Sequence, residues 1–97
     1  MWARISRYQF PPDETDEAVR RFEQAVAAIA SRPGLRRTDV YVNRDSGAGI
    51  SVTLWESRDA MKASEEAADA LRSGIALDLT GWIQDVEEYE LARSDEF

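Results

Sequence analysis

The sequence has 97 residues, 43% of them hydrophobic, which suffices for one folded domain and argues against intrinsic disorder. The formal net charge of −7 argues against a nucleic-acid or anionic-membrane partner, because phosphate binding requires clustered cations. The chain has no histidine and no cysteine, which excludes serine–histidine triads, histidine or thiolate zinc sites, disulfides and histidine-ligated haem.

The first segment with regular alternation is residues 2–10, which the spacing predicts as a β-strand. Aromatic side chains share one face of it and small aliphatic ones the other: Trp2, Tyr8 and Phe10 against Ala3 and Ile5. Pro11 and Pro12 end the strand, because proline cannot donate to a β-ladder.

A helix is predicted next. Residues 13–16 supply capping groups and an acidic first turn that suits the helix dipole. The apolar stripe that follows consists of Val19, Phe22, Val26 and Ile29. The helix is expected to end before Pro33 and Gly34.

Two further strands are predicted on either side of a glycine-containing hairpin loop at residues 45–49. The first covers about residues 35–43, with Val40 and Val42 on one face and Tyr41 and Asn43 on the other. The second covers residues 50–56. Its faces are Ile50, Val52 and Leu54 on one side and Ser51, Thr53 and Trp55 on the other.

The last third of the chain predicts a helix and a closing strand. The helix is expected from Arg58 to Ser73, capped by Ser57 and closed by Gly74. Residues 75–81 are expected to form an irregular connection. A strand follows at about residues 83–91, and residues 93–97 form a charged tail.

The order β-α-β-β-α-β predicts an α+β, ferredoxin-like domain over residues 1–97, with an antiparallel sheet and both helices on one face. Neither face of the first or the third strand is strongly polar, whereas a sheet with one solvated face should alternate apolar with charged residues. We therefore expect a symmetric homodimer in which two sheets pack face to face. A monomer with a solvated sheet face is the alternative.

Four segments of the chain resemble the antibiotic biosynthesis monooxygenase-like family of dimeric α/β barrels. They are residues 3–8 (ARISRY), 32–35 (RPGL), 51–57 (SVTLWES) and 86–91 (VEEYEL). The resemblance spans nearly the whole chain. It implies a homodimer whose two sheets form a barrel, with a small-molecule pocket in each subunit between sheet and helices.

Trp55 is the residue through which the resemblance points to chemistry. Family members oxygenate polycyclic aromatic phenols without a cofactor, or degrade haem, and both groups use a tryptophan at the end of the third strand. The haem degraders add an asparagine on the first strand and a helix histidine, whereas this chain has Ser6 and no histidine. The phenol oxygenases have an asparagine where this chain has Ser51, and a serine offers one donor where an amide offers two.

The candidate ligand-binding residues all lie on predicted strands. They are Trp55, Tyr8, Ser6, Ser51, Thr53 and Tyr41. Trp55 is either the wall of a pocket for a flat aromatic ligand or a large core residue, and Tyr8 is either a donor in that pocket or an aromatic residue at an interface edge. Whether Tyr41 and Asn43 face the pocket depends on strand register, and Asn43 is also typical of a tight turn. No catalytic residue is assigned.

The acidic residues of the last strand are expected to form a solvated edge rather than a metal site. They are Asp85, Glu87, Glu88 and Glu90. They lack a repeated spacing or a partner loop, and charges along an edge strand discourage aggregation. We predict no metal ligand and no cofactor.

Two functions remain open on the sequence. The first is a cofactor-independent monooxygenase-like protein that acts on or binds a small aromatic or polyketide-like molecule. The second is a non-catalytic homodimer that binds a ligand or another protein. The polar first ten residues, the lack of an apolar run of ~20 residues and the absence of cysteine fit a cytoplasmic location.

Overall fold

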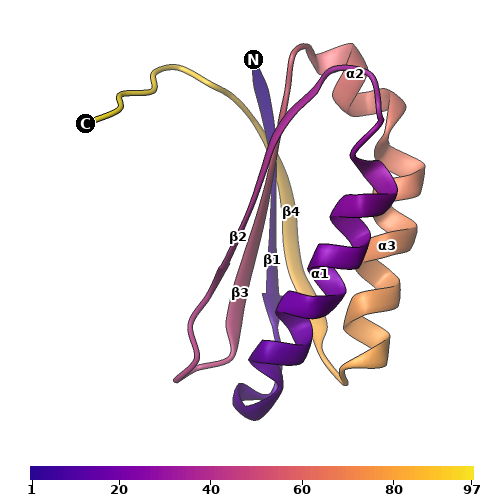
Figure 1. The fold of residues 1–97 in the computed structure, drawn as a ribbon, viewed down its shortest axis with the longest axis vertical. Coiled ribbons are helices and arrows are strands. Elements are labelled where there is room, and N and C mark those ends of the chain that lie inside the picture. Colours follow the sequence, from indigo (N-terminus) through magenta and orange to yellow (C-terminus); the bar gives the residue numbers. More distant parts are fainter.

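The computed structural model describes residues 1–97 as a four-stranded antiparallel sheet with helices on one face (Figure 1). The strands are β1 (Trp2–Gln9), β2 (Leu35–Val42), β3 (Ala48–Trp55) and β4 (Trp82–Glu90). The helices are α1 (Thr15–Ile29), α2 (Arg58–Ala63) and α3 (Glu65–Asp78), and a short 3-10 turn, η1 (Pro12–Glu14), precedes α1. The strand order β2-β3-β1-β4 confirms the ferredoxin-like arrangement. After β4, residues 91–97 lack regular structure and extend away from the helices (Figure 1).

Cross-strand pairing defines the two faces of the sheet. Ser6 of β1 lies opposite Ser51 of β3, which lies opposite Val40 of β2, and this row faces the helices. The neighbouring row, with Ile5 opposite Val52, faces away from them. Because successive residues of a strand alternate, the hydroxyl-bearing face of β3 lies under the helices and its aliphatic face is left open.

A cluster of aromatic side chains joins the sheet to the helices. The Tyr8 and Phe22 rings meet edge to face, with centroids 5.1 Å apart. Phe10, just beyond β1, stacks on Tyr8 at 5.6 Å. Apolar residues of α1 and of the α3 end complete the buried cluster: Ala18, Ile75 and Leu79. The core thus lies between β1 and the two longer helices.

The β2–β3 hairpin is anchored to the end of β1 at Gly47. The Phe10 backbone N–H donates to the Gly47 carbonyl at 2.9 Å. Gly47 has a φ of +80°, and a Cβ there would lie 2.0 Å from the Phe10 oxygen, so only glycine permits this approach. The Asn43 side chain accepts from the backbone N–H groups of Asp45 and Ser46, which is the turn-forming role weighed for it above.

The second helical region differs from the expected single helix. Ser64 interrupts it, because its hydroxyl donates to the Met61 carbonyl at 2.7 Å and α2 ends there. α3 then continues through Gly74 to Asp78, so the expected helix end at Gly74 and the irregular start of residues 75–81 were wrong. Burial of apolar residues beyond Gly74 outweighs the ~1 kcal/mol that glycine costs inside a helix. These residues are Ile75, Ala76 and Leu79.

The sheet face away from the helices is uncovered in the single chain. Its centre consists of half-buried aliphatic side chains: Ala3, Ile5, Ile50, Val52 and Leu54. Exposed aromatic residues border it: Tyr41, Trp82 and Tyr89. On the same face Arg7 pairs with Asp85 at 3.1 Å and with Glu87 at 3.6 Å. We call this surface the open face.

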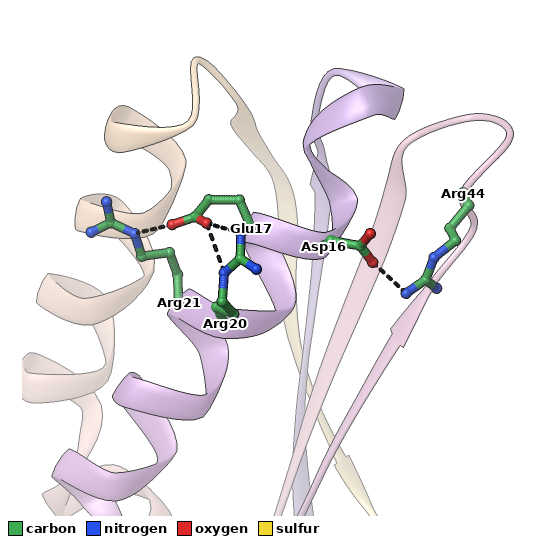
Figure 2. A network of polar contacts seen from close by, with 5 residues as sticks. All are labelled: Asp16, Glu17, Arg20, Arg21 and Arg44. Atoms are coloured by element: carbon green, nitrogen blue, oxygen red, sulfur yellow. Dashed lines mark hydrogen bonds and ion pairs between the residues drawn. The ribbon is translucent and has the colours of Figure 1, made fainter.

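Several ion pairs lie on the exposed side of α1 (Figure 2). Glu17 accepts from Arg20 and Arg21 within the helix. Arg44, in the β2–β3 loop, donates to Asp16 at 2.7 Å. Such exposed pairs contribute about 0–1 kcal/mol each, so apolar packing determines where α1 lies. None of the helices has the length and apolar character needed to cross a membrane.

Candidate functional site

A partly open cavity of about 60 Å³ lies between the helix-covered face of the sheet and helices α1 and α3. One part of its lining is apolar and comes mainly from the helices: Phe22, Ala25, Val26, Ile29, Val40, Ala68 and Ile75. The other part is polar and comes from β1, β3 and α3: Arg4, Ser6, Tyr8, Ser51, Thr53 and Arg72. The cavity therefore suits a ligand with one apolar and one polar end.

Hydroxyl groups form a row along the strand floor of the cavity. The Tyr8 hydroxyl lies 3.2 Å from the Ser51 hydroxyl, and either can donate. Ser6 is the direct cross-strand neighbour of Ser51. Burial raises the pKa of Tyr8 above its ordinary value, while hydrogen bonds to Ser51 and Ser6 and the charge of Arg72 act in the opposite direction. Tyr8 consequently stays protonated at neutral pH and can donate a hydrogen bond to a ligand.

Arg4 extends from β1 beneath the break between α2 and α3. Its side chain donates to the Met61 carbonyl at 2.7 Å and to the Ser64 hydroxyl at 3.2 Å. The residue is 3% exposed. Burial lowers the pKa of Arg4, and the through-space charges of Glu65 and Glu88 partly oppose this.

Arg72 reaches the same cavity from α3. Its only protein hydrogen bond is to Asp69, one helical turn earlier on the exposed side of α3. Burial lowers the pKa of Arg72, and the charge of Arg4 lowers it further, whereas Tyr8 and the through-space charge of Glu65 oppose the shift. The two arginines are therefore close enough to repel one another.

Four of the six predicted site residues line the cavity together: Ser6, Tyr8, Ser51 and Thr53. Trp55 lies beside it as a fully buried residue, with its indole N–H donating to the Thr53 hydroxyl at 2.9 Å and the Arg4 guanidinium 6.0 Å from its ring centroid. Tyr41 lies on the open face and is 57% exposed, because its neighbour Val40 takes the helix-facing position of β2.

The acidic residues of β4 are divided between the two faces of an edge strand. Asp85 and Glu87 pair with Arg7 on the open face, and Glu88 pairs with Lys62 of α2 at 3.1 Å. No group of three or more acidic residues converges on a point where it could hold a metal ion.

The sequence reasoning missed both arginines of the cavity, Arg4 and Arg72. A signal for Arg4 existed, since it shares the parity of Ser6 and Tyr8 on a strand face predicted to be covered. Arg72 follows Ala68 by four residues, so it continues that helix stripe toward the sheet. A charged residue at a position predicted to be buried is unusual enough to indicate a site.

A family model described as antibiotic biosynthesis monooxygenase matches residues 1–73. Among solved structures, the haem degrader MhuD from Mycobacterium tuberculosis, with two haems bound in its active site, has a TM-score of 0.77 at 20% identity. That comparison covers 99% of this chain and 100% of MhuD. SnoaB, a cofactor-independent oxygenase from Streptomyces nogalater, has a TM-score of 0.69 at 17% identity over 96% of this chain and 94% of its own.

MupZ from Pseudomonas fluorescens has a TM-score of 0.73 at 13% identity, over 90% of this chain and 69% of its own. At these identities the structural similarities establish a shared fold. No curated protein matches the chain significantly in sequence.

Proposed function

The chain belongs to the antibiotic biosynthesis monooxygenase family, and from that premise we propose that it oxygenates a small aromatic or polyketide-like molecule without a metal or haem. The observation that carries this proposal is the row of hydroxyl groups under an apolar helix wall. Such a cavity can hold the oxygen-bearing edge of a flat ligand against Tyr8 and Ser51 and its ring against the apolar wall.

The enclosed volume limits how the ligand binds. An apolar cavity of about 150 Å³ admits benzene, and the present one measures about 60 Å³. The polar edge of the ligand therefore occupies the enclosed part, and the remainder of the ring lies in the open part.

Dioxygen is the oxidant in this proposal and the substrate is the only reductant. A ring CH₂ group of an anthrone-type substrate loses a proton to give a carbanion, which transfers electrons to dioxygen. The carbon becomes a carbonyl that contains one oxygen atom, and the second oxygen atom leaves as water. Tyr8 and Ser51 would hold the substrate oxygen and stabilise the negative charge that develops on it.

Haem does not fit the residues of this cavity. Haem iron is held by histidine, cysteine, methionine or tyrosine side chains. The chain has neither of the first two, and no methionine lines the cavity. The raised pKa of Tyr8 disfavours the tyrosinate that iron would require. The enclosed volume is also far below that of a porphyrin. The proposal therefore contains no step through haem.

Homodimerisation through the open face is the second part of the proposal. Its support is the strip of half-buried aliphatic residues at the centre of that face, bordered by aromatic and ion-paired residues. A second copy packed sheet to sheet would remove this apolar surface from water. A cytoplasmic location remains a prediction from the composition.

Dioxygen uptake with anthrone-type phenols tests the oxygenation. We expect uptake above the buffer rate, equimolar with the quinone formed. Uptake no faster than in buffer across a panel of such substrates would reject oxygenation.

Ligand binding without catalysis is the second candidate, favoured by the lack of a free general base in the cavity. The only acidic residue of its lining, Asp39, lies in the row of Val52 that faces away from the helices, and it is paired with Arg37 at 2.8 Å. A base is needed to remove a substrate proton unless the substrate ionises by itself. Saturable binding of an aromatic probe together with no dioxygen uptake would select this candidate.

A further inference from the structure

We infer that the cavity is an oxyanion site, in which Arg4 and Arg72 bind the carboxylate or phenolate of a flat organic acid. This inference rests on the proposed function in one respect, that the cavity is the ligand site. It adds the charge of the ligand and the residues that select it.

Arg4 is a buried cation without a carboxylate partner. Its hydrogen bonds go to a neutral carbonyl and a neutral hydroxyl, which occupy two of the five N–H donors of a guanidinium. Glu65 and Glu88 act on it only through space. A buried charge is ordinarily paired, so an unpaired one beside a cavity indicates a missing anion.

Arg72 has more unused hydrogen-bonding capacity than Arg4. Asp69 is its single protein acceptor, and the Asp69 side chain is 62% exposed, whereas that of Arg72 is 10% exposed. Arg72 lines the cavity, and no other protein group accepts from its guanidinium. Two parallel N–H groups of a guanidinium fork match the two oxygens of a carboxylate.

The electrostatics of the cavity are opposite in sign to those of the chain as a whole. The chain has a formal net charge of −7. The one acidic residue of the cavity lining, Asp39, lies in the row of Val52 that faces away from the helices, and it is paired with Arg37. The charged side chains on the helix-covered side are therefore Arg4, which has no ion-pair partner, and Arg72, whose only partner is the exposed Asp69. Bringing two like charges together in a buried site is unfavourable, and one bound anion would relieve that repulsion for both.

The neutral side chains define the rest of the ligand. Tyr8 stays protonated and can add a hydrogen bond to the same oxyanion. The helix wall of Phe22, Val26 and Ile75 is apolar and suits a hydrocarbon ring. A ligand that binds as its phenolate needs no base in the cavity, because it has already lost the proton when it binds.

A structural role explains in part why Arg4 is buried, but it does not explain the burial of Arg72. The Arg4 guanidinium donates to one carbonyl in the last turn of α2, that of Met61, where a cation is favourable. Arg72 caps nothing and bonds only to an exposed neighbour. Arg72 is therefore the position at which a binding role and a structural role can be separated.

Calorimetric titration of the full chain with benzoate and with benzamide tests the inference. The two probes share ring and shape and differ in charge. We expect benzoate to bind at least about tenfold more tightly, as is typical for a hydrogen bond to a charged group. A second pair, 4-nitrophenolate and nitrobenzene, distinguishes a phenolate from a carboxylate as the oxyanion.

The variant Arg72→Gln should lose that preference for benzoate, while the matched variant Arg20→Gln should retain it. Arg20 is an exposed cation of α1 that does not line the cavity. If Arg72→Gln fails to fold, Arg72→Lys keeps the charge and removes the fork, and benzoate should then bind several-fold more weakly than in the parent chain.

Equal affinity for benzoate and benzamide would overturn the inference, as would unchanged benzoate affinity in Arg72→Gln or an equal loss in Arg20→Gln. If the anionic probes fail while an anthrone still consumes dioxygen, only the oxyanion site is rejected. If they bind as expected and no substrate consumes dioxygen, the oxyanion site stands and the oxygenation is rejected.

Discussion

The helix-covered face and the open face of the sheet are built from the same strands. The covered face is more polar, and the open face more apolar, than a stable monomer requires. The covered face buries two arginines and a row of hydroxyl groups where apolar residues would stabilise the domain. The open face leaves aliphatic and aromatic residues in water where polar ones would suffice. These opposite departures are what the two proposals explain, a ligand bound on the covered side and a second copy of the chain packed on the open face.

Removing an aromatic ring from the core should weaken the packing between the helices and the covered face, and should leave the residues of the open face unchanged. Phe22→Ala deletes the ring that meets Tyr8 and Phe10, and we expect a loss of about 3–5 kcal/mol in the free energy of unfolding. Urea denaturation measures it, with Phe22→Leu as a milder control. A loss below about 1 kcal/mol would mean that α1 is not held by this cluster.

Adding a charge to the open face should dissociate the proposed homodimer without disturbing the cavity. Ile5→Arg places a cation at the centre of the open face, next to Glu87. In a monomer the Glu87 carboxylate can form an ion pair with it. We expect the dimer dissociation constant to rise about 100-fold or more, because an interface would bury that charge. Light scattering over a concentration series gives the mass.

Ala28→Arg, on the exposed side of α1, is the matched control for this charge. A parent chain that remains monomeric at high concentration would contradict the dimer, as would an Ile5→Arg variant that dimerises normally.

A substitution in the cavity on the covered face should have a smaller effect on stability. Tyr8→Phe removes the hydrogen bond to Ser51 and should cost about 1 kcal/mol at neutral pH. The raised pKa of Tyr8 stabilises the folded state below the ordinary tyrosine pKa of about 10, and this contribution is lost as pH rises through the folded value.

Stability should therefore fall less steeply above pH ~10 in Tyr8→Phe than in the parent chain. Denaturation curves at several pH values measure the slope. Parallel slopes would show that Tyr8 is as solvated when folded as when unfolded.

The smallest expected effect concerns α3, the helix that carries Arg72. Gly74→Ala should raise the free energy of unfolding by about 0.5–1 kcal/mol, since a Cβ there meets nothing within 4 Å. Gly34→Ala is the opposing control, because Gly34 has a φ of +84° and its Cβ would lie 2.6 Å from that of Ala60. A destabilised Gly74→Ala would indicate that α3 does not run through this position.

Strand alternation explains what the sequence could reveal of the site. The period of two places Ser6 and Tyr8 on the same face of β1, and Ser51 and Thr53 on the same face of β3. The register between β1 and β3 puts these four side chains on one face of the sheet. Alternation alone could not say which face of β2 the helices cover, so Tyr41 was included among the candidates. Nor could it say that the cavity ends before Trp55.

The parts that sequence reasoning missed depend on tertiary burial. Gly74 is an ordinary helix terminator by local rules, and only the packing of the residues after it carries α3 onward. The break at Ser64 depends on a hydroxyl bonding back to Met61 and on Arg4, which lies 60 residues away in sequence. Spacing places Arg72 on the helix stripe of Ala68, but arginine is usually exposed, so its burial could be established only from the packing of α3 on the sheet.

The strict alternation of β3 has a consequence for how such a protein can diverge. Point substitutions at Ser51 or Thr53 can alter the cavity without changing the open face, and substitutions at Ile50 or Leu54 can alter the open face without changing the cavity. An insertion or deletion of one residue within the strand would instead exchange the two sets of side chains. Descendants of this chain are therefore free to change either property by substitution, whereas the length of β3 is constrained by both.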